Sequence, residues 1–185
     1  AEDAAAIDAI FARTLEQAGD LPGLWVGVWD PQKGVHIAAY GKAAVNGPAA
    51  TVADHGRIGS ITKTFTATAV LEQVAKGAFR LDSTIADLLP DFAATHPEVG
   101  AITVEQLLGM RSGIPDYGNT AVVIPRVIAD PSHAWTKEEL IEAAFTLPLQ
   151  PPGTPGYSTT NTQILALILE KVTGTPVDRK STRLN

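Results

Sequence analysis

The chain has 185 residues, of which 45% are hydrophobic and 18% charged, and its formal net charge is −6. This composition is typical of a globular domain and excludes disordered and fibrous classes. The 14 Lys and Arg residues are scattered, so we expect neither a nucleic-acid partner nor an anionic membrane partner. The absence of cysteine excludes disulfides, thiolate metal sites and thiol catalysis. Composition alone leaves the oligomeric state unassigned.

No segment approaches the roughly 18–20 apolar residues that a membrane-spanning helix needs, so we expect no membrane span. The chain begins with AEDAAAIDAIFARTL, which has no basic region ahead of its apolar residues. We therefore expect a secretory signal peptide to be absent or already removed.

Apolar residues at helical spacing predict an amphipathic helix over residues 4–18, closed by Gly19. Two runs rich in β-branched and aromatic residues, LWVGVWD and VHIAAYGKA, flank PQKG and predict a β-hairpin. Residues 44–56 are expected to form a loop. The segment RIGSITKTFTATAVLEQVAKG predicts a helix over residues 60–76, with Gly77 as its C-terminal cap.

Farther along the chain, LDSTIADLLPDF predicts a short helix that ends at Pro90. The prolines of LPLQPPGTPGYST predict an extended segment, and the last helix is expected over residues 161–173, ended by Gly174. A hairpin followed by several helices predicts an α/β layered fold. Three pairs have the spacing of a helix capping box: Thr103 and Gln106, Thr136 and Glu139, and Thr160 and Gln163.

Lys63 follows Ser60 by three residues, which places both side chains on one face of the predicted helix. The rest of that face is apolar, so we expect Lys63 to point toward the interior, where loss of water disfavours its charged form. It could then accept a proton from Ser60. The apolar face continues through Ala67, Val70 and Val74, and the opposite, polar face consists of Thr62, Thr66, Gln73 and Lys76.

The position of Ser60 at a helix N-terminus adds a second argument for catalysis. Free backbone N–H groups and the helix dipole there favour a developing negative charge, as an oxyanion site requires. The alternative is that Ser60 only caps the helix while Lys63 extends along the surface.

Tyr157 in PGYSTTN is the candidate for a second proton-transfer group. It lies in an extended segment just before a helix, where a phenol can be held in a cleft and can pass a proton to a leaving group. A tyrosine in a Pro/Gly loop more often only packs, so this role depends on the presence of Ser60 and Lys63. A metal hydrolase is disfavoured, and we expect no metal or other cofactor, because the four histidines have no ligand spacing such as HExxH: His36, His55, His96 and His133.

Three segments in order, RIGSITKTFTA, LLGMRSGIPDY and PGYSTTNTQILALILEKVTG, resemble the penicillin-recognising serine hydrolases. The similarity is greatest to the branch that contains class C β-lactamases, DD-carboxypeptidases and related esterases, and it extends to about Val177. The resemblance implies a serine β-lactamase/DD-peptidase-like α/β (α+β) fold, with an antiparallel sheet flanked by helices and a separate helical region. Residues 1–177 would form the N-terminal part of one such domain.

The resemblance also implies roles for individual residues. Ser60 would be the acylated nucleophile and donate one oxyanion N–H, Lys63 would be its proton partner, and Tyr157 would relay protons as base and acid. The family's Tyr-x-Asn motif uses its third residue to contact the lysine and the substrate amide. Thr159 stands at that position here, with asparagine only at Asn161. A threonine hydroxyl could accept from Lys63 but lacks the two-sided hydrogen bonding of an amide.

The family's third motif, Lys or His followed by Thr or Ser and then Gly, does not follow Tyr157 in this chain. We therefore expect an incomplete sheet and little activity from residues 1–185 alone. The last eight residues, DRKSTRLN, reproduce the translation of a common sequencing-adapter stretch, GATCGGAAGAGCACACGTCTGAAC. This match predicts that residues 178–185 are non-native read-through after a truncated gene, although a native basic loop is the alternative.

The sequence thus predicts a serine hydrolase that acts through an acyl-enzyme on an amide or ester. The substrate would be a small molecule or a peptidoglycan peptide: a D-Ala-D-Ala terminus, a β-lactam or a small ester. The alternative is a non-enzymatic penicillin-binding or sensor domain that retains the fold. Export to the periplasm, cell wall or medium of a bacterium is expected from the family's cell-wall substrates.

Overall fold

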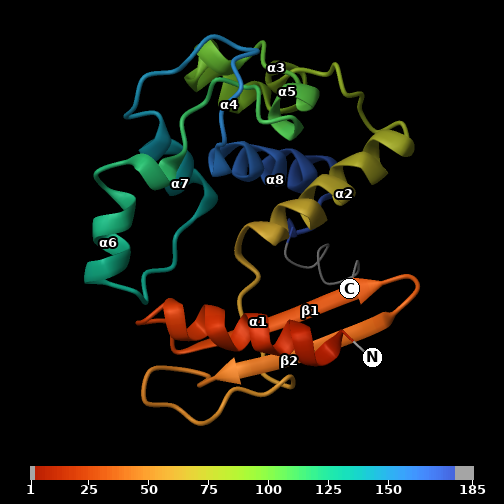
Figure 1. Ribbon diagram of the computed structural model, residues 1–185. Coiled ribbons are helices and arrows are strands. Elements are labelled where there is room, and N and C mark those ends of the chain that lie inside the picture. Colours follow the sequence, from red (N-terminus) through yellow and green to blue (C-terminus); the bar gives the residue numbers. More distant parts are fainter. Residues whose placement is uncertain (1–2, 178–185) are drawn as a thin grey trace. The chain divides into compact units, whose positions relative to one another are not determined.

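The computed structural model describes residues 3–177 and divides into two compact units, one that ends at Arg57 and one that begins at Ile58 (Figure 1). The predicted read-through segment, residues 178–185, lies outside the described residues. The first unit contains helix α1 (Ala4–Gln17) and the antiparallel strands β1 (Gly23–Asp30) and β2 (Gly34–Gly41). The predicted N-terminal helix and hairpin are confirmed.

The hairpin turn is determined by its own residues. The Asp30 carboxylate accepts hydrogen bonds from the backbone N–H groups of Gln32 and Lys33, at 2.9 and 2.8 Å. Gly34 has φ +90°, a conformation that glycine adopts without a steric penalty. These local bonds fix the register in which Asp30 pairs with Gly34 and Gly23 pairs with Gly41.

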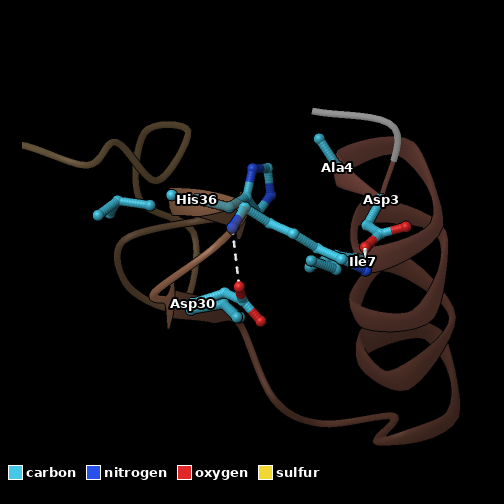
Figure 2. Close-up of a pocket in the computed structure, with 9 residues that line it drawn as sticks. Asp3, Ala4, Ile7, Asp30 and His36 are labelled. Carbon is cyan, nitrogen blue, oxygen red and sulfur yellow. Dashed lines mark hydrogen bonds and ion pairs between the residues drawn. The ribbon is translucent and has the colours of Figure 1, made fainter.

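Helix α1 is attached to β2 by polar side chains. The Asp8 carboxylate is 2.8 Å from the His36 ring and accepts a 2.5 Å hydrogen bond from the Tyr40 phenol. This bond raises the pKa of Tyr40 to about 12. A small pocket lies between the start of α1 and the hairpin turn, and Figure 2 labels five of its lining residues: Asp3, Ala4, Ile7, Asp30 and His36.

The second unit is helical. After a 3-10 turn (Gly59–Ile61), its elements follow as α2 (Thr62–Ala75), α3 (Ile85–Leu88), α4 (Pro90–Thr95), a 3-10 turn (Pro97–Val99), α5 (Val104–Leu108), a 3-10 turn (Tyr117–Asn119), α6 (Val123–Ala129), α7 (Lys137–Ala144) and α8 (Thr159–Thr173). Together with the hairpin of the first unit, these helices confirm the predicted mixed α/β fold with an antiparallel sheet and a helical region.

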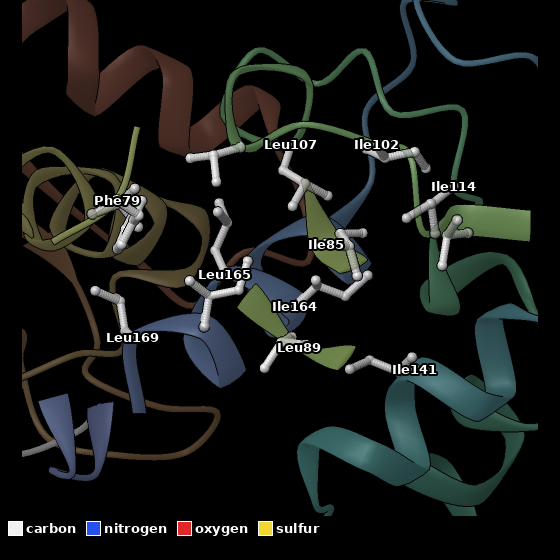
Figure 3. Close-up of a cluster of buried hydrophobic side chains, with 14 of the residues drawn as sticks. Phe79, Ile85, Leu89, Ile102, Leu107, Ile114, Ile141, Ile164, Leu165 and Leu169 are labelled. Carbon is white, nitrogen blue, oxygen red and sulfur yellow. The ribbon is translucent and has the colours of Figure 1, made fainter. Parts of the chain in front are cut away.

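Helix α8 is the centre of the second unit (Figure 1). It contacts α2, α3, α5 and α7, and it buries Ile164, Ile168 and Leu169 completely. Removing these aliphatic side chains from water is the main favourable term that holds the helices together. Figure 3 shows the resulting core, with these labelled members: Phe79, Ile85, Leu89, Ile102, Leu107, Ile114, Ile141, Ile164, Leu165 and Leu169.

Two prolines behave differently from the expectation that proline ends a helix. Pro90 does end α3, but it also opens α4, because the first position of a helix needs no N–H donor. Pro125 lies in the first turn of α6, a helix that the sequence did not predict, and it is tolerated there for the same reason.

The capping-box predictions are confirmed at two of three places. Thr103 with Gln106 and Thr136 with Glu139 form both reciprocal bonds. At the last helix the prediction is wrong, since α8 begins two residues earlier, at Thr159. The Thr160 side chain is buried and its hydroxyl donates to the Pro115 carbonyl, 2.7 Å away. A long-range contact has therefore replaced the expected local cap.

Candidate active site

Ser60 lies in the 3-10 turn that leads into α2. The turn begins at Gly59, whose φ of +55° falls in the left-handed region that favours glycine. The predicted α-helical start at residue 60 is thus corrected, because α2 itself begins at Thr62. The Ser60 residue is exposed.

Lys63 lies in the first turn of α2, and its Nζ donates a hydrogen bond to Ser60 Oγ at 3.1 Å. The side chain is half-buried rather than enclosed. The expected polar face of this helix is wrong at two positions, because Thr66 and Gln73 are 5% and 6% exposed. Lys63 therefore lies at the edge of the buried face, which consists of Thr66, Ala69, Val70 and Gln73.

Tyr157 lies two residues before Thr159, the first residue of α8. It belongs to the proline-rich segment LPLQPPGTPGYST, which was predicted to be extended. Its Oη is 2.6 Å from Ser60 Oγ, and Lys63 Nζ lies 4.9 Å from the centre of its ring. The hydrogen bond with Lys63, followed by the one with Ser60, lowers the pKa of the Tyr157 phenol. The structure thus brings together three of the predicted site residues from two helix starts.

These contacts define a short path for a proton. As an ammonium group, Lys63 can only donate, so the Ser60 oxygen accepts from Lys63 and its own proton is available to Tyr157. A cation beside the phenol stabilises the phenolate, which is the form that can take that proton. A serine placed between a cation and a base has the geometry of an activated nucleophile.

A shallow pocket adjoins Tyr157. Its walls come from the loop after α5, the Tyr117–Asn119 turn and the proline-rich segment before α8, and include Ile114, Asp116, Gln150, Gly156 and Tyr157. Across residues 3–177, the His, Asp and Glu side chains form no group of three that could hold a metal ion. Over the same residues, every helix is too short or too polar to cross a bilayer.

A family model described as beta-lactamase matches residues 11–183, nearly the whole chain. The chain belongs to the beta-lactamase family. Solved structures agree with this assignment. A D-stereospecific amidohydrolase from Streptomyces sp. is 30% identical, with a TM-score of 0.83 over 98% of this chain. A D-amino acid amidase from Ochrobactrum anthropi SV3, complexed with L-phenylalanine amide, is 26% identical, with a TM-score of 0.82 over 100% of this chain.

This beta-lactamase family chain spans only part of its relatives. It covers 53% of the Streptomyces amidohydrolase and 51% of the Ochrobactrum amidase. It is also 46% identical to penicillin-binding protein 4 of Amycolatopsis lactamdurans over 57 residues, which are 30% of this chain and 15% of that protein.

The hydrogen-bond partner of Thr159 in this beta-lactamase family member is not Lys63, the predicted one. Its hydroxyl donates to Asp116 Oδ2 at 3.1 Å, and its backbone N–H donates to the same oxygen at 3.0 Å. A smaller contribution from the Thr159 hydroxyl also lowers the pKa of Tyr157. Thr159 therefore lies at the site, but its hydroxyl is held by a carboxylate rather than by Lys63.

Sequence reasoning missed Asp116, which binds Thr159, and Ser112, which binds Asn161. Ser112 Oγ donates to Asn161 Oδ1 at 2.6 Å, and the Asn161 amide donates to the Leu107 carbonyl at 3.3 Å. Asp116 and Ser112 both lie in the segment LLGMRSGIPDY, which is one of the three segments that resemble the family. Nothing in the local pattern there indicates a contact with residues more than 40 positions away.

Proposed function

We propose that this chain is part of a serine hydrolase that forms an acyl-enzyme on Ser60 and cleaves an amide or ester bond. The observation that carries the proposal is the contact of Ser60 Oγ with both Tyr157 Oη, at 2.6 Å, and Lys63 Nζ, at 3.1 Å. The amidohydrolase and amidase names of the two similar structures support an amide or a related acyl donor.

In the proposed acylation step, Ser60 Oγ attacks the carbonyl carbon of the substrate while its proton passes to Tyr157 Oη. Lys63 favours the phenolate form of Tyr157 and lies beside the charge that moves. The backbone N–H of Ser60, in the turn before α2, would donate to the oxyanion. Tyr157 then returns the proton to the leaving amine or alcohol as the bond to the carbonyl carbon breaks.

Deacylation uses the same groups in the reverse sense. A water molecule takes the place of the leaving group and gives a proton to Tyr157 as it attacks the carbonyl carbon of the ester formed with Ser60. The proton then returns to Ser60 Oγ as the acid product leaves. Among the possible substrates, a peptidoglycan peptide would require an exported protein, so export belongs to that form of the proposal.

The test uses the full-length protein and its Ser60→Ala variant. Both are incubated with a fluorescent penicillin, a p-nitrophenyl ester and D-phenylalanine amide, and adducts and products are followed by mass spectrometry. We expect a wild-type adduct on Ser60 and a loss of at least about 10³-fold in its rate of formation in the variant. Ser132→Ala, which alters an exposed serine, is the control and should match wild type.

The outcome also separates the two candidate functions. Adduct formation with release of hydrolysed product supports the hydrolase. A stable Ser60 adduct without turnover favours a penicillin-binding or sensor domain, which the similarity to penicillin-binding protein 4 supports. Absence of any Ser60-dependent adduct with all three probes would overturn the catalytic proposal.

A further inference from the structure

Residues 115–117 and residues 158–160 are joined by reciprocal hydrogen bonds between residues that are 43 to 45 positions apart. The hydroxyls of Ser158 and Thr160 both donate to the Pro115 carbonyl, at 3.1 and 2.7 Å. In return, the backbone N–H of Tyr117 donates to the Thr160 hydroxyl oxygen at 3.1 Å. Ser158 and Thr160 are 1% and 0% exposed, so water does not compete for these bonds.

Asp116 lies at the centre of this connection. Its Oδ2 accepts both the backbone N–H and the hydroxyl of Thr159, while its Oδ1 accepts the N–H of Gly118 at 2.8 Å. Ser158, at the N-cap position of α8, makes no capping bond with its own side chain. Asp116 thus satisfies the first free N–H of α8 from a remote segment, through charge-assisted bonds that are stronger than neutral ones.

The position of Tyr157 depends on this backbone more than on packing. Its side chain is 60% exposed, so neighbouring apolar groups confine it little. Nevertheless its Oη must stay 2.6 Å from Ser60 Oγ for proton transfer. Both chain neighbours of Tyr157 are hydrogen-bonded: the Gly156 N–H donates to the Met110 carbonyl at 2.9 Å, and the Ser158 hydroxyl donates to the Pro115 carbonyl at 3.1 Å. The pair of bonds to Asp116 fixes Thr159, two residues farther on.

We propose that Asp116 is a positioning residue for Tyr157: by binding the backbone and hydroxyl of Thr159, it holds the phenol against Ser60 and Lys63. The inference rests on the proposed function, since it concerns the same proton transfer. It assigns Asp116 no contact with the reacting atoms. A carboxylate in this place also gives Thr159 a defined role, as the residue through which the loop and the start of α8 are joined.

The expected signature is a change in the pH profile of acylation. The charged or titratable groups that face Tyr157 are Lys63 from α2, and Asp116 and Tyr117 from the segment before α6. The bonds with Lys63 and Ser60 lower the pKa of Tyr157 more than the Thr159 hydroxyl does. If removal of the Asp116 carboxylate lets the Tyr157 phenol move away from Lys63 and Ser60, its bonds with these two residues weaken. The pKa of Tyr157 then rises toward its ordinary value.

The experiment compares Asp116→Ala with Asp87→Ala in the full-length protein. Asp87 is a matched control because it also accepts a backbone N–H and a hydroxyl from one threonine, Thr84, both at 2.8 Å. Acylation of Ser60 by the p-nitrophenyl ester is measured as a function of pH, and folding is checked by urea denaturation. Asp116→Asn, which keeps one oxygen acceptor, is the conservative variant and carries the test if Asp116→Ala does not fold.

We expect Asp116→Ala to acylate about 10–100-fold more slowly than wild type, because small misplacements of a catalytic group cost rates of this order. The pH at which the acylation rate reaches half of its maximum should be higher in Asp116→Ala than in wild type, and Asp116→Asn should have an intermediate midpoint. Asp87→Ala should leave the midpoint unchanged. An unchanged or lowered midpoint in the Asp116 variants would overturn the positioning role, while Ser60 acylation in wild type would still support the proposed function. Absence of wild-type acylation would instead overturn the proposed function itself.

Discussion

Replacing Tyr157 by phenylalanine tests the proton transfer most directly. The substitution removes only Oη, the atom 2.6 Å from Ser60 Oγ, and leaves the aromatic ring beside Lys63. Because the side chain is 60% exposed, the free energy of unfolding should change by less than about 0.5 kcal/mol. Any large loss of activity can therefore be attributed to the missing hydroxyl.

The magnitude follows from the role of the phenol as general base. A positioned base contributes about 10²–10⁴-fold to the rate, so we expect Tyr157→Phe to lower the acylation rate of Ser60 by that factor. Each tenfold loss raises the barrier by about 1.4 kcal/mol. Lys63 and Ser60 lower the pKa of Tyr157 below its ordinary value of about 10. The wild-type rate should therefore rise with pH through a midpoint below 10, as phenol becomes phenolate, and the variant should lack this rise.

The assay is the pre-steady-state rate of Ser60 acylation by a p-nitrophenyl ester from pH 5 to 10 in the full-length protein. Tyr40→Phe, which removes a hydrogen-bonded phenol hydroxyl in the first unit, is the control and should keep the wild-type rate near neutral pH. If Tyr157→Phe acylates within about threefold of wild type and retains the same pH midpoint, the phenol is not the base and the proposed mechanism is wrong.

Two further predictions concern stability. Leu107 is completely buried, so Leu107→Ala should lower the free energy of unfolding by about 2–5 kcal/mol in urea denaturation, whereas Leu71→Ala, at a side chain that is 48% exposed, should cost less than about 0.5 kcal/mol. The hydrogen bond to Asp8 raises the pKa of Tyr40 in the folded protein to about 12. The stability that this bond contributes is therefore fully present below the unfolded pKa of about 10 and is lost as the pH rises through the folded pKa. The melting temperatures of wild type and Tyr40→Phe should therefore converge between pH 10 and 12, and a constant difference would contradict this account.

The features that the sequence predicted well are those that nearby residues determine. Thr103 and Thr136 each form a complete capping box with a residue three positions later, so the pattern contains every group involved. The hairpin is likewise determined by Asp30 and Gly34 at its turn. Ser60 and Lys63 meet because a helical turn separates them, which made their contact predictable from spacing alone.

The wrong predictions for Thr66, Gln73 and Thr160 share a physical cause, which is burial of polar side chains by distant segments. Thr66 and Gln73 were placed on a solvent-facing stripe because they are polar, yet both are buried. Thr160 has the sequence of a helix cap, but its hydroxyl donates to Pro115 instead. A local pattern cannot contain such partners, so periodicity misassigns these faces. For the same reason Asp116 carried no signal, although it holds the residue that stands at the family's asparagine position.

The placement of Asn161 decides which residue occupies that third motif position. On an α-helix, positions two apart point about 200° away from each other, so Thr159 and Asn161 cannot face the same group. The Asn161 side chain is completely buried, and its amide is bonded to Ser112 and to the Leu107 carbonyl. Asn161 is thus part of the core and is not a displaced copy of the motif asparagine. Through Ser112 it holds the loop that carries Asp116, and Thr159 remains the residue at the third motif position, two residues after Tyr157.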